Sequence, residues 1–360
     1  MVEISVNINK NPQKYSIFID NLPIENLKNE ILKYCNDEKF LIVISEKVFK
    51  LYGKILGFDR KNIFVLKDGE KEKNFKNYQK ITNRALKMKL TRKSTIIAIG
   101  GGVCGDLAGF AASTYMRGIN FIQVPTTLLA ATDSSVGGKV AIDTDFGKNL
   151  VGSFYQPKVV LINTNFLKTL DNRQFKTGLG EVVKYAFIEK SCKCNEEFNL
   201  INFLSEYKEK ILSRDLETIS ELIRICIVLK ASVVQKDETE TDLRRILNFG
   251  HTYAHAIEKI TKYKKYTHGE TVTEGINFAF NLACKLDMIE KNYKFLASDI
   301  LNKFDFKKIR KFPIEKMIKI MQTDKKATSK SIVFILPSDY AKVDAIELSA
   351  QKLLDILANS

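Results

Sequence analysis

The order of apolar runs along the first half of the chain is the feature that most restricts its fold. Five short runs of β-branched and aliphatic residues predict buried strands, at positions 40–44, 62–66, 95–99, 121–124 and 158–162. Segments long enough for a helix separate the first four runs. Because strands that alternate with helices build a parallel sheet covered on both faces, we expect an α/β domain here.

The second half of the chain has a different pattern. Strand-like runs nearly vanish after about residue 172, and apolar residues recur at helical spacing over 216–234, 251–260 and 271–286. Residues 331–337 are a late exception and predict a small strand. A chain of 360 residues exceeds the size of a single core. We therefore expect two domains, residues 1–172 and residues 173–360, that share a cleft.

Composition excludes several classes of protein. The chain is 45% hydrophobic and 28% charged, as in ordinary soluble proteins, and no apolar run approaches the roughly 20 residues that span a bilayer. Residues 1–9 alternate like a strand and lack the apolar core of a signal peptide. The six cysteines form no CxxC pair, which favours reduced thiols and a cytoplasmic location.

The net charge of +15 comes from lysines dispersed along the whole chain. There is no basic block and no aromatic–basic platform, so we expect neither nucleic acid nor a membrane as a partner. The positive charge instead favours a small, highly anionic substrate.

All three histidines, His251, His255 and His268, lie within eighteen consecutive residues. His251 and His255 are four apart, so a helix places both imidazoles on one face. Together with His268 they could form a three-point metal cage, because neutral imidazole is a common ligand. The alternative is a helix with two surface or core histidines and an unrelated third.

A glycine-rich turn follows the run at 95–99. Gly100, Gly102 and Gly105 match GxGxxG ahead of a predicted helix at 107–115, where backbone amides can approach a pyrophosphate. The acidic residue that usually holds the ribose is missing after the next strand, which leads into PTT. A tight turn that needs glycine only for packing is the alternative.

The stretch PTTLLAATDSSVGGKVAID, followed by TDFGKNLVG, places hydroxyls, carboxylates and lysines around glycines. Lys139, Lys148 and Asn149 can hold anionic oxygens there. A solvated loop with incidental lysines is the alternative.

Seven segments occur in one order along the chain: GGGVCGDLAGFAASTYMRG, QVPTTLLAATDSSVGGKVAID, GKNLVGSF, GLGEVVKYA, LRRILNFGHTYAHAIE, HGE and MQTDKK. As an ordered set they resemble the 3-dehydroquinate synthase family of sugar phosphate cyclases, over about residues 40–335. The resemblance implies a Rossmann-like, NAD-binding α/β domain and a mainly helical metal- and substrate-binding domain, with the active site between them. It also implies one tightly bound NAD, one divalent metal ion (zinc, with cobalt as the alternative) and a homodimer.

The metal ligands implied by the resemblance are Glu181, His251 and His268. A carboxylate and two imidazoles leave open positions for a substrate, which suits a Lewis acid. His255 would then be an acid/base group and a phosphate contact instead of a ligand.

The resemblance also assigns residues to the two small molecules. The NAD site would comprise Glu70, Lys73, Gly101, Gly102, Asp106, Thr126, Thr127, Asp133, Lys139, Lys148, Phe166 and Thr169. Glu70 and Lys73 would lie near the nucleoside, which accounts for the missing acidic residue. Substrate contacts would be Asp133, Lys139, Asn149, Lys184, Lys230, Arg244, Asn248 and either Lys325 or Lys326, with Lys326 favoured. Arg117 would reach the phosphate of a substrate in the neighbouring subunit.

The implied reaction converts 3-deoxy-D-arabino-heptulosonate 7-phosphate to 3-dehydroquinate and phosphate, in the shikimate pathway of aromatic amino acid biosynthesis. It runs through transient oxidation by NAD, β-elimination of phosphate, re-reduction, ring opening and an intramolecular aldol step, so that NAD is regenerated. The carboxylate and phosphate of the substrate account for several lysines and arginines.

Three alternatives remain open. A sister cyclase would make a 2-deoxy-scyllo-inosose or a valiolone, but Arg244, Lys230 and Asn248 suit a substrate with a carboxylate. A glycerol-dehydrogenase-like metal alcohol dehydrogenase would release NADH with each turnover. A non-catalytic binding protein would have lost a ligand or a phosphate lysine, and none is lost.

Several positions depart from the family pattern. Ser45 stands where an aspartate usually contacts the adenosine ribose, Ala254 replaces a glycine and Gly180 replaces an alanine. Asp171 and Gln174 replace a proline and a glutamate near the domain junction. The metal-ligating positions and the charged substrate contacts are retained, so we expect an active enzyme.

Overall fold

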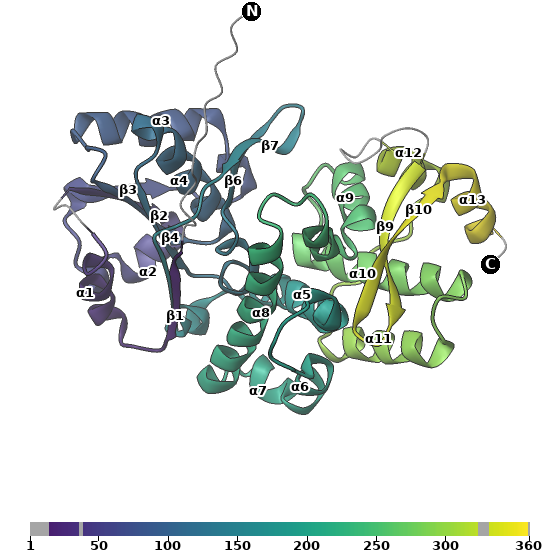
Figure 1. Ribbon diagram of the computed structural model, residues 1–360. Coiled ribbons are helices and arrows are strands. Elements are labelled where there is room, and N and C mark those ends of the chain that lie inside the picture. The colour runs from purple at the N-terminus through teal and green to yellow at the C-terminus, as the bar shows by residue number, and fades with distance from the viewer. Residues whose placement is uncertain (1–13, 36–38, 323–330, 359–360) are drawn as a thin grey trace, which may run out of the picture.

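The structure is a computed structural model that describes residues 14–35, 39–322 and 331–358, which form two regions side by side (Figure 1). The strand expected over residues 1–9 and the lysines at 325 and 326 lie outside these ranges. Within them, no helix combines the length and apolar character needed to cross a membrane.

The first region is built on a six-stranded parallel sheet with the order β1-β8-β5-β4-β2-β3. Its strands are β1 (Ser16–Asp20), β2 (Phe40–Ser45), β3 (Ile63–Leu66), β4 (Thr95–Gly100), β5 (Asn120–Pro125) and β8 (Val159–Asn163). All five predicted strands are confirmed. The sixth, β1, was not predicted, because it is a short edge strand whose residues alternate between exposed and half-buried.

Helices cover both faces of this sheet (Figure 1). On one face, Leu41 and Val43 of β2 pack in one cluster with residues of α3 (Phe75–Lys87) and α4 (Gly102–Thr114). On the other, Ile42 and Ile44 pack with α1 (Leu27–Leu32) and α2 (Glu46–Leu56). The strand is buried on both sides, and the α/β expectation is confirmed.

The stretch after the glycine-rich turn contains a β-hairpin, β6 (Lys139–Thr144) and β7 (Gly147–Phe154), paired antiparallel. A solvated loop was the alternative expectation for this stretch, and the structure shows two paired strands instead. At the tip of the hairpin, Phe146, Gly147 and Lys148 line the main cavity.

The second region is mainly helical. Its helices are α5 (Asn172–Ile188), α6 (Leu200–Glu206), α7 (Lys208–Leu212), α8 (Leu216–Lys236), α9 (His251–Ile260), α10 (His268–Lys285), α11 (Lys291–Lys303), α12 (Ile314–Gln322) and α13 (Ala350–Ala358). The three predicted helical segments are confirmed as α8, α9 and α10. The predicted late strand is β9 (Ser331–Asp339), which pairs with β10 (Lys342–Ser349), a strand that was not predicted.

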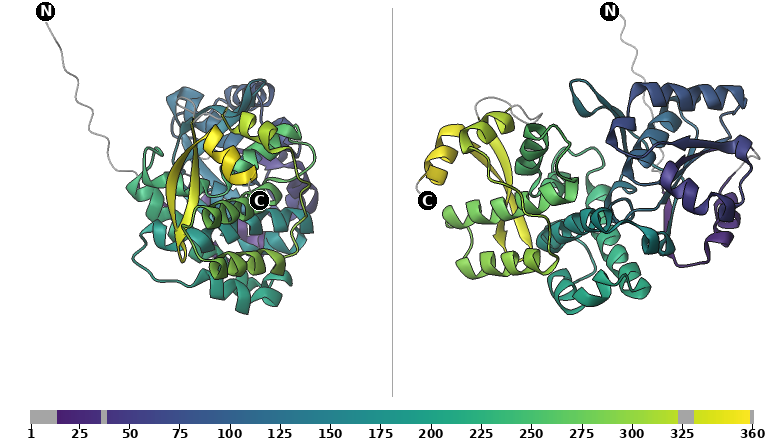
Figure 2. Two further views of the ribbon diagram at one scale, coloured as in Figure 1. Left: turned by 90° about the vertical axis from the view of Figure 1, so that its right-hand side faces the viewer. Right: turned by 180° about the vertical axis from the view of Figure 1, so that it is seen from behind.

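Helices α5 and α8 lie between the sheet and the rest of the helical region (Figures 1 and 2). Val160 and Ile162 of β8 belong to the same apolar cluster as Leu179 of α5 and Leu229 of α8. One continuous core therefore joins the two regions. Helix α5 begins at Asn172, while the domain boundary placed at residue 172 stays a prediction.

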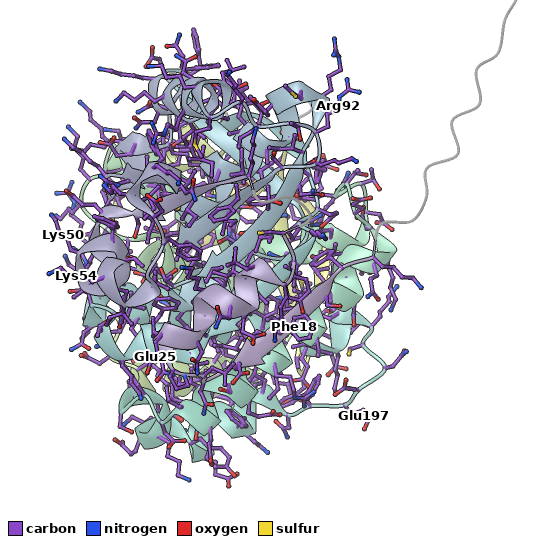
Figure 3. The ribbon with its side chains drawn as sticks, turned by 90° about the vertical axis from the view of Figure 1, so that its left-hand side faces the viewer. Phe18, Glu25, Lys50, Lys54, Arg92 and Glu197 are labelled. Atoms are coloured by element: carbon purple, nitrogen blue, oxygen red, sulfur yellow. The ribbon has the colours of Figure 1, made fainter. Side chains whose placement is uncertain are left out.

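Basic residues are dispersed over the outer face of the sheet region. Lys50 and Lys54 of α2 lie close together at the left of this view, Arg92 lies at its upper right, and Glu25 lies below the two lysines (Figure 3). This distribution agrees with a general excess of lysine instead of one binding surface.

Helix α10 touches α9 and α5 through backbone atoms. A Cβ added to Gly275 of α10 would overlap the carbonyl oxygen of Gly250, which caps α9 with a φ of +79°. A Cβ added to Gly180 of α5 would lie 2.6 Å from the carbonyl oxygen of Gly269. Only glycine permits helices to approach this closely, and each contact lies next to a predicted metal ligand.

We predict that Gly275→Ala lowers the free energy of unfolding by about 1–3 kcal/mol, because the added methyl group pushes α9 from α10. Urea unfolding of the apo protein measures this. Gly53→Ala is the matched control, since its Cβ would meet the half-buried Phe49 ring, which can turn aside. Equal stability of the Gly275→Ala and Gly53→Ala proteins would contradict the proposed tight contact.

Candidate active site

Three side chains from three helices converge at the junction of α5, α9 and α10. One ligand atom each from Glu181, His251 and His268 all lie within 4.8 Å of one another. Oε1 of Glu181 is 3.4 Å from Nε2 of His251 and 3.2 Å from Nε2 of His268. These distances can contract around one divalent ion, and a carboxylate with two imidazoles is a common catalytic zinc set.

Both histidines direct the same ring nitrogen toward Glu181. Nδ1 of His251 is 3.0 Å from the carbonyl oxygen of Phe249, and Nδ1 of His268 is 2.9 Å from Oε1 of Glu258. Each Nδ1 is thus placed to donate a proton to an oxygen, which leaves Nε2 as the ligand atom.

Burial and neighbouring charges shift the pKa values of the two imidazoles in opposite directions. Burial lowers the pKa of His251, in spite of the nearby Glu181 carboxylate. Burial also opposes the charged form of His268, but the carboxylates of Glu258 and Glu181 outweigh it and raise its pKa to about 10. The carboxylates of Glu258 and Glu181 therefore make the surroundings of His268 favourable for positive charge.

Glu181 is 1% exposed, and within the described part of the chain neither of its oxygens accepts a hydrogen bond of good geometry. Burial favours its neutral form, yet Lys184, whose Nζ is 2.5 Å from Oε2, and His251 hold the pKa of this carboxyl well below its usual range. A buried charge of this kind requires cationic partners. The contact between Glu181 and Lys184 follows from helical spacing, since residues three apart share a face of the helix.

The start of α10 is fixed by a set of polar contacts. Thr267 and Glu270 form a capping box around His268, and Arg173 of α5 holds Glu270 through two bonds of 2.8 and 2.9 Å. Thr177 of α5 donates to Thr267 over 2.9 Å. His268 is therefore held in place by both the cap and the crossing with α5.

A cavity of about 1080 Å³ runs between the two regions and is lined by two of the three candidate ligands, His251 and His268. This exceeds the roughly 300–1,000 Å³ of most small-molecule sites, so it has room for two bound molecules. His251, His255 and His268 line one end, while Ser45 and Leu51 line the other.

Ten of the twelve residues predicted for a nucleotide line this cavity: Glu70, Lys73, Gly101, Gly102, Asp106, Thr126, Thr127, Lys148, Phe166 and Thr169. The turn between β4 and α4 presents Gly101 and Gly102, where a Cβ would come within 3.0 Å of Thr127 and 3.1 Å of Ser134. The bare backbone and the N-terminus of α4 suit an anionic ligand. The helix starts at Gly102, before the 107 expected from the sequence.

Lys73 joins the sheet region to the hairpin. The residue is 3% exposed, and its ammonium group lies 2.5 Å from both Asp106 of α4 and the side-chain oxygen of Asn149 in β7. Burial opposes the charge, but Asp106 and Glu70 outweigh it and raise the pKa of Lys73. Lys148, next to Asn149, lies 3.4 Å from Glu70 and 4.5 Å above the Tyr263 ring, so the hairpin tip contacts both regions.

Asp133 is the centre of a second buried network. Tyr185 donates to its Oδ1 over 2.5 Å, and the ammonium groups of Lys230 and Lys184 lie 3.0 and 3.7 Å from that oxygen. Burial favours the neutral acid, yet Lys230 and Lys184 hold its pKa well below the usual range. Because Lys184 also contacts Glu181, this network is continuous with the three candidate ligands.

Three further predicted residues meet around the loop before α9. Lys139 forms an ion pair with Glu240, and Asn248 donates to the same carboxylate over 2.6 Å. Arg244 is 1% exposed and donates to the carbonyl oxygens of Glu238 and Gly137, while its buried Nε has no hydrogen-bond partner among the residues that the structure describes.

One predicted residue, Arg117, lies apart from this assembly. Arg117 is exposed in the turn after α4, with a φ of +65°, and it does not line the cavity. Lys326 lies outside the described residues. His255 is close to the ligands, with its ring centroid 5.5 Å from that of His251, but it is not part of the three-atom group. The roles of these residues stay predictions.

The departures from the family pattern have local explanations in four cases. Asp171 caps α5 by accepting from the amides of Arg173 and Gln174, and Gln174 lines the cavity. Gly180 allows the close crossing with Gly269, and Ala254 is fully buried in the helical core. Ser45 lines the far end of the cavity and is 9% exposed.

Sequence reasoning assigned no role to three residues of the site, Glu240, Tyr185 and Glu258. Glu258 lies at helical spacing from His251 and His255, so periodicity could have identified it. Tyr185 follows Lys184 directly, and only the fold shows that its hydroxyl meets Asp133. Glu240 comes from a loop whose partners depend on tertiary structure.

A glycine-rich turn and a carboxylate–imidazole triad on opposite walls of one cleft suit an enzyme that holds a nucleotide beside a metal ion. Models of the 3-dehydroquinate synthase N-terminal and C-terminal regions match residues 63–177 and 178–327. The chain belongs to the 3-dehydroquinate synthase family.

Individual relatives agree with this assignment. A 3-dehydroquinate synthase of Campylobacter fetus is 42% identical over 99% of both chains. One of Clostridium botulinum is 45% identical over 84% of this chain and 85% of its own length.

Solved structures share the fold. A 2-epi-5-epi-valiolone synthase of Streptomyces hygroscopicus, with NAD⁺ and Zn²⁺ bound, superposes with a TM-score of 0.86 at 20% identity and covers 99% of this chain and 98% of its own. A 2-deoxy-scyllo-inosose synthase in complex with carbaglucose-6-phosphate, NAD⁺ and Co²⁺ gives 0.81 at 25% identity over 96% of both chains. A probable glycerol dehydrogenase of Sinorhizobium meliloti gives 0.65 at 14% identity over 95% of both chains.

Burial lowers the pKa of Lys230 to about 8, against the opposing charge of Asp133. Below this pH the side chain is a cation, and above it the charge is lost. We predict that kcat/KM for an anionic sugar phosphate falls, by up to about tenfold per pH unit, as the pH rises through about 8. Lys230→Arg should move this fall to higher pH. A profile that is flat to pH 10, or identical in both proteins, would contradict the role of Lys230.

Proposed function

We propose that this chain converts 3-deoxy-D-arabino-heptulosonate 7-phosphate to 3-dehydroquinate and phosphate, with NAD and one divalent metal ion as resident cofactors. This would make it a carbon–oxygen lyase. The observation that carries the proposal is the convergence of Glu181, His251 and His268 at the end of a cavity whose other wall is the glycine-rich turn. Full-length relatives named 3-dehydroquinate synthase support it.

The donor set fits a divalent ion, because one buried carboxylate oxygen, Oε1 of Glu181, lies near the Nε2 atoms of both His251 and His268. We assign Glu181, His251 and His268 as its ligands, with zinc favoured over cobalt. The glycine cradle at Gly101 and Gly102 fits the pyrophosphate of NAD. When bound, NAD supplies a hydride acceptor that is restored in each turnover, and the metal supplies a Lewis acid for a substrate hydroxyl.

The remaining residues bind and orient a dianionic substrate. Lys230 and Lys184 bring positive charge to a buried network beside the candidate ligand Glu181, where Asp133, held by Tyr185, contacts both ammonium groups. Arg244, whose buried Nε has no hydrogen-bond partner among the described residues, would contact the substrate carboxylate. Asn149, Asn248 and Lys139 would add polar contacts, and His255 beside the ligands would exchange a proton with the phosphate end.

Two further parts of the proposal concern assembly and location. Arg117 is exposed and remote from its own cavity, which is compatible with a contact to the phosphate in a second subunit. A homodimer follows from that role. We also propose a cytoplasmic location, on the basis of six free cysteines.

The test is phosphate release from the seven-carbon substrate with catalytic NAD, before and after chelation and zinc restoration. We expect release that stops with the chelator, returns with zinc and produces no net NADH. Glu181→Ala should bind no metal and release no phosphate, while Glu274→Gln, on α10 away from the ligands, should resemble the wild type.

Other outcomes of this assay identify the rival functions. Net NADH would favour a metal alcohol dehydrogenase. Turnover of glucose 6-phosphate or sedoheptulose 7-phosphate, without turnover of the seven-carbon acid, would favour a sister cyclase.

We predict that Arg244→Ala raises KM for the carboxylate-bearing substrate, because a charge-assisted contact is worth about 1.5–3 kcal/mol. Arg244→Lys keeps the charge and should lose less. Steady-state kinetics on the folded variants measures both. An unchanged KM in Arg244→Ala would remove this residue from the substrate site.

A further inference from the structure

Glu258 lies in α9 and shares a helix face with His251 and His255, at i+7 and i+3. The residue is 5% exposed. Its Oε1 is 2.9 Å from Nδ1 of His268 on the neighbouring helix, and Thr271 donates to the same oxygen over 3.3 Å. A carboxylate of α9 therefore holds the ring of a candidate ligand on α10.

The two nitrogens of this imidazole have separate partners. Nδ1 faces Glu258, whereas Nε2 is 3.2 Å from Glu181. Glu258 lies on the far side of the ring from the ligand atom, so it cannot bind the same ion as Nε2. It can accept the Nδ1 proton and leave the Nε2 lone pair free for a metal.

His251 offers an internal comparison. Its Nδ1 is held by the backbone carbonyl of Phe249 instead of a carboxylate. A neutral carbonyl fixes the tautomer, whereas a carboxylate also adds negative charge beside the ring and makes Nε2 more basic. The Nδ1 atoms of the two candidate ligands thus have different acceptors, and the charged acceptor, which is the stronger one, belongs to His268.

A purely structural role accounts poorly for this carboxylate. The packing of α9 on α10 is already fixed by the backbone contact of Gly250 with Gly275 and by a continuous apolar core. Burying a carboxylate between these helices costs free energy unless it is compensated. The contacts to it from the described residues are the hydroxyl of Thr271 and, at the shorter distance, the His268 ring, the one of the two that can carry a positive charge, so the carboxylate acts mainly on that ring.

We propose that Glu258 is a positioning residue for the metal ion: it fixes the tautomer and plane of His268 and increases the affinity of the site for a divalent cation. This inference rests on the metal-binding part of the proposed function. It concerns binding of the ion, so it can be measured without turnover.

The experiment compares zinc affinity in the wild type, Glu258→Gln, Glu258→Ala and Glu274→Gln, by competition with a chromophoric chelator and without substrate. Glu258→Gln keeps an oxygen that can accept from Nδ1 but loses the charge, and we expect about tenfold weaker binding. Glu258→Ala loses both, and we expect about 100-fold weaker binding. Glu274→Gln removes a half-buried carboxylate of α10 that does not contact a ligand and should bind as the wild type does.

Melting of the apo proteins and the visible spectrum of the cobalt-loaded proteins separate positioning from stability. We expect apo melting temperatures close to that of the wild type and a cobalt spectrum altered in both Glu258 variants. If Glu258→Ala fails to fold, the isosteric Glu258→Gln decides. Zinc affinity of Glu258→Gln within twofold of the wild type overturns the inference. A wild-type protein that binds no zinc overturns the proposed metal site itself, and the inference with it.

Discussion

The buried carboxylate of Glu181 is the interaction on which the rest of the site depends. It is almost fully removed from water, so it remains ionised only because Lys184 and two imidazoles surround it. Lys184 extends the same charge network to Asp133 and Lys230. A divalent cation at this point would compensate the negative charge of Glu181. Removal of Lys184 or of one imidazole would instead leave this buried charge with less compensation.

Helix packing and the parallel sheet bring the two halves of the site together. Backbone contacts at Gly250 and Gly275, and at Gly180 and Gly269, let α5, α9 and α10 approach closely enough for their ligands to meet. On the opposite wall, the carboxyl ends of the parallel strands place the glycine-rich turn at the cavity, as is general for ligand sites in open α/β sheets. The hairpin tip at Lys148 joins the two walls through Glu70 and Tyr263.

Much of this arrangement could be predicted from local sequence. The buried strands are continuous apolar runs, so five of the six were found, and the spacing of His251 and His255 placed both on one helix. The edge strand β1 and strand β10 were not predicted, because strands that are largely exposed lack continuous apolar runs. Spacing alone also suggested three histidines as a cage. The structure groups Glu181 with His251 and His268. Glu181 lies seventy positions before His251, and only tertiary packing and the family resemblance assign it to the site. Glu240 and Tyr185 escaped prediction for the same reason, since their partners lie in other elements.

The most direct test of this account is an anomalous difference map from crystals of the zinc-loaded protein, recorded on both sides of the zinc absorption edge. The account predicts one peak per chain at about 2.0–2.2 Å from an oxygen of Glu181 and from Nε2 of His251 and His268, with His255 outside the coordination sphere. A peak coordinated by His255 in place of Glu181, or zinc bound elsewhere in a protein that releases phosphate, would contradict it.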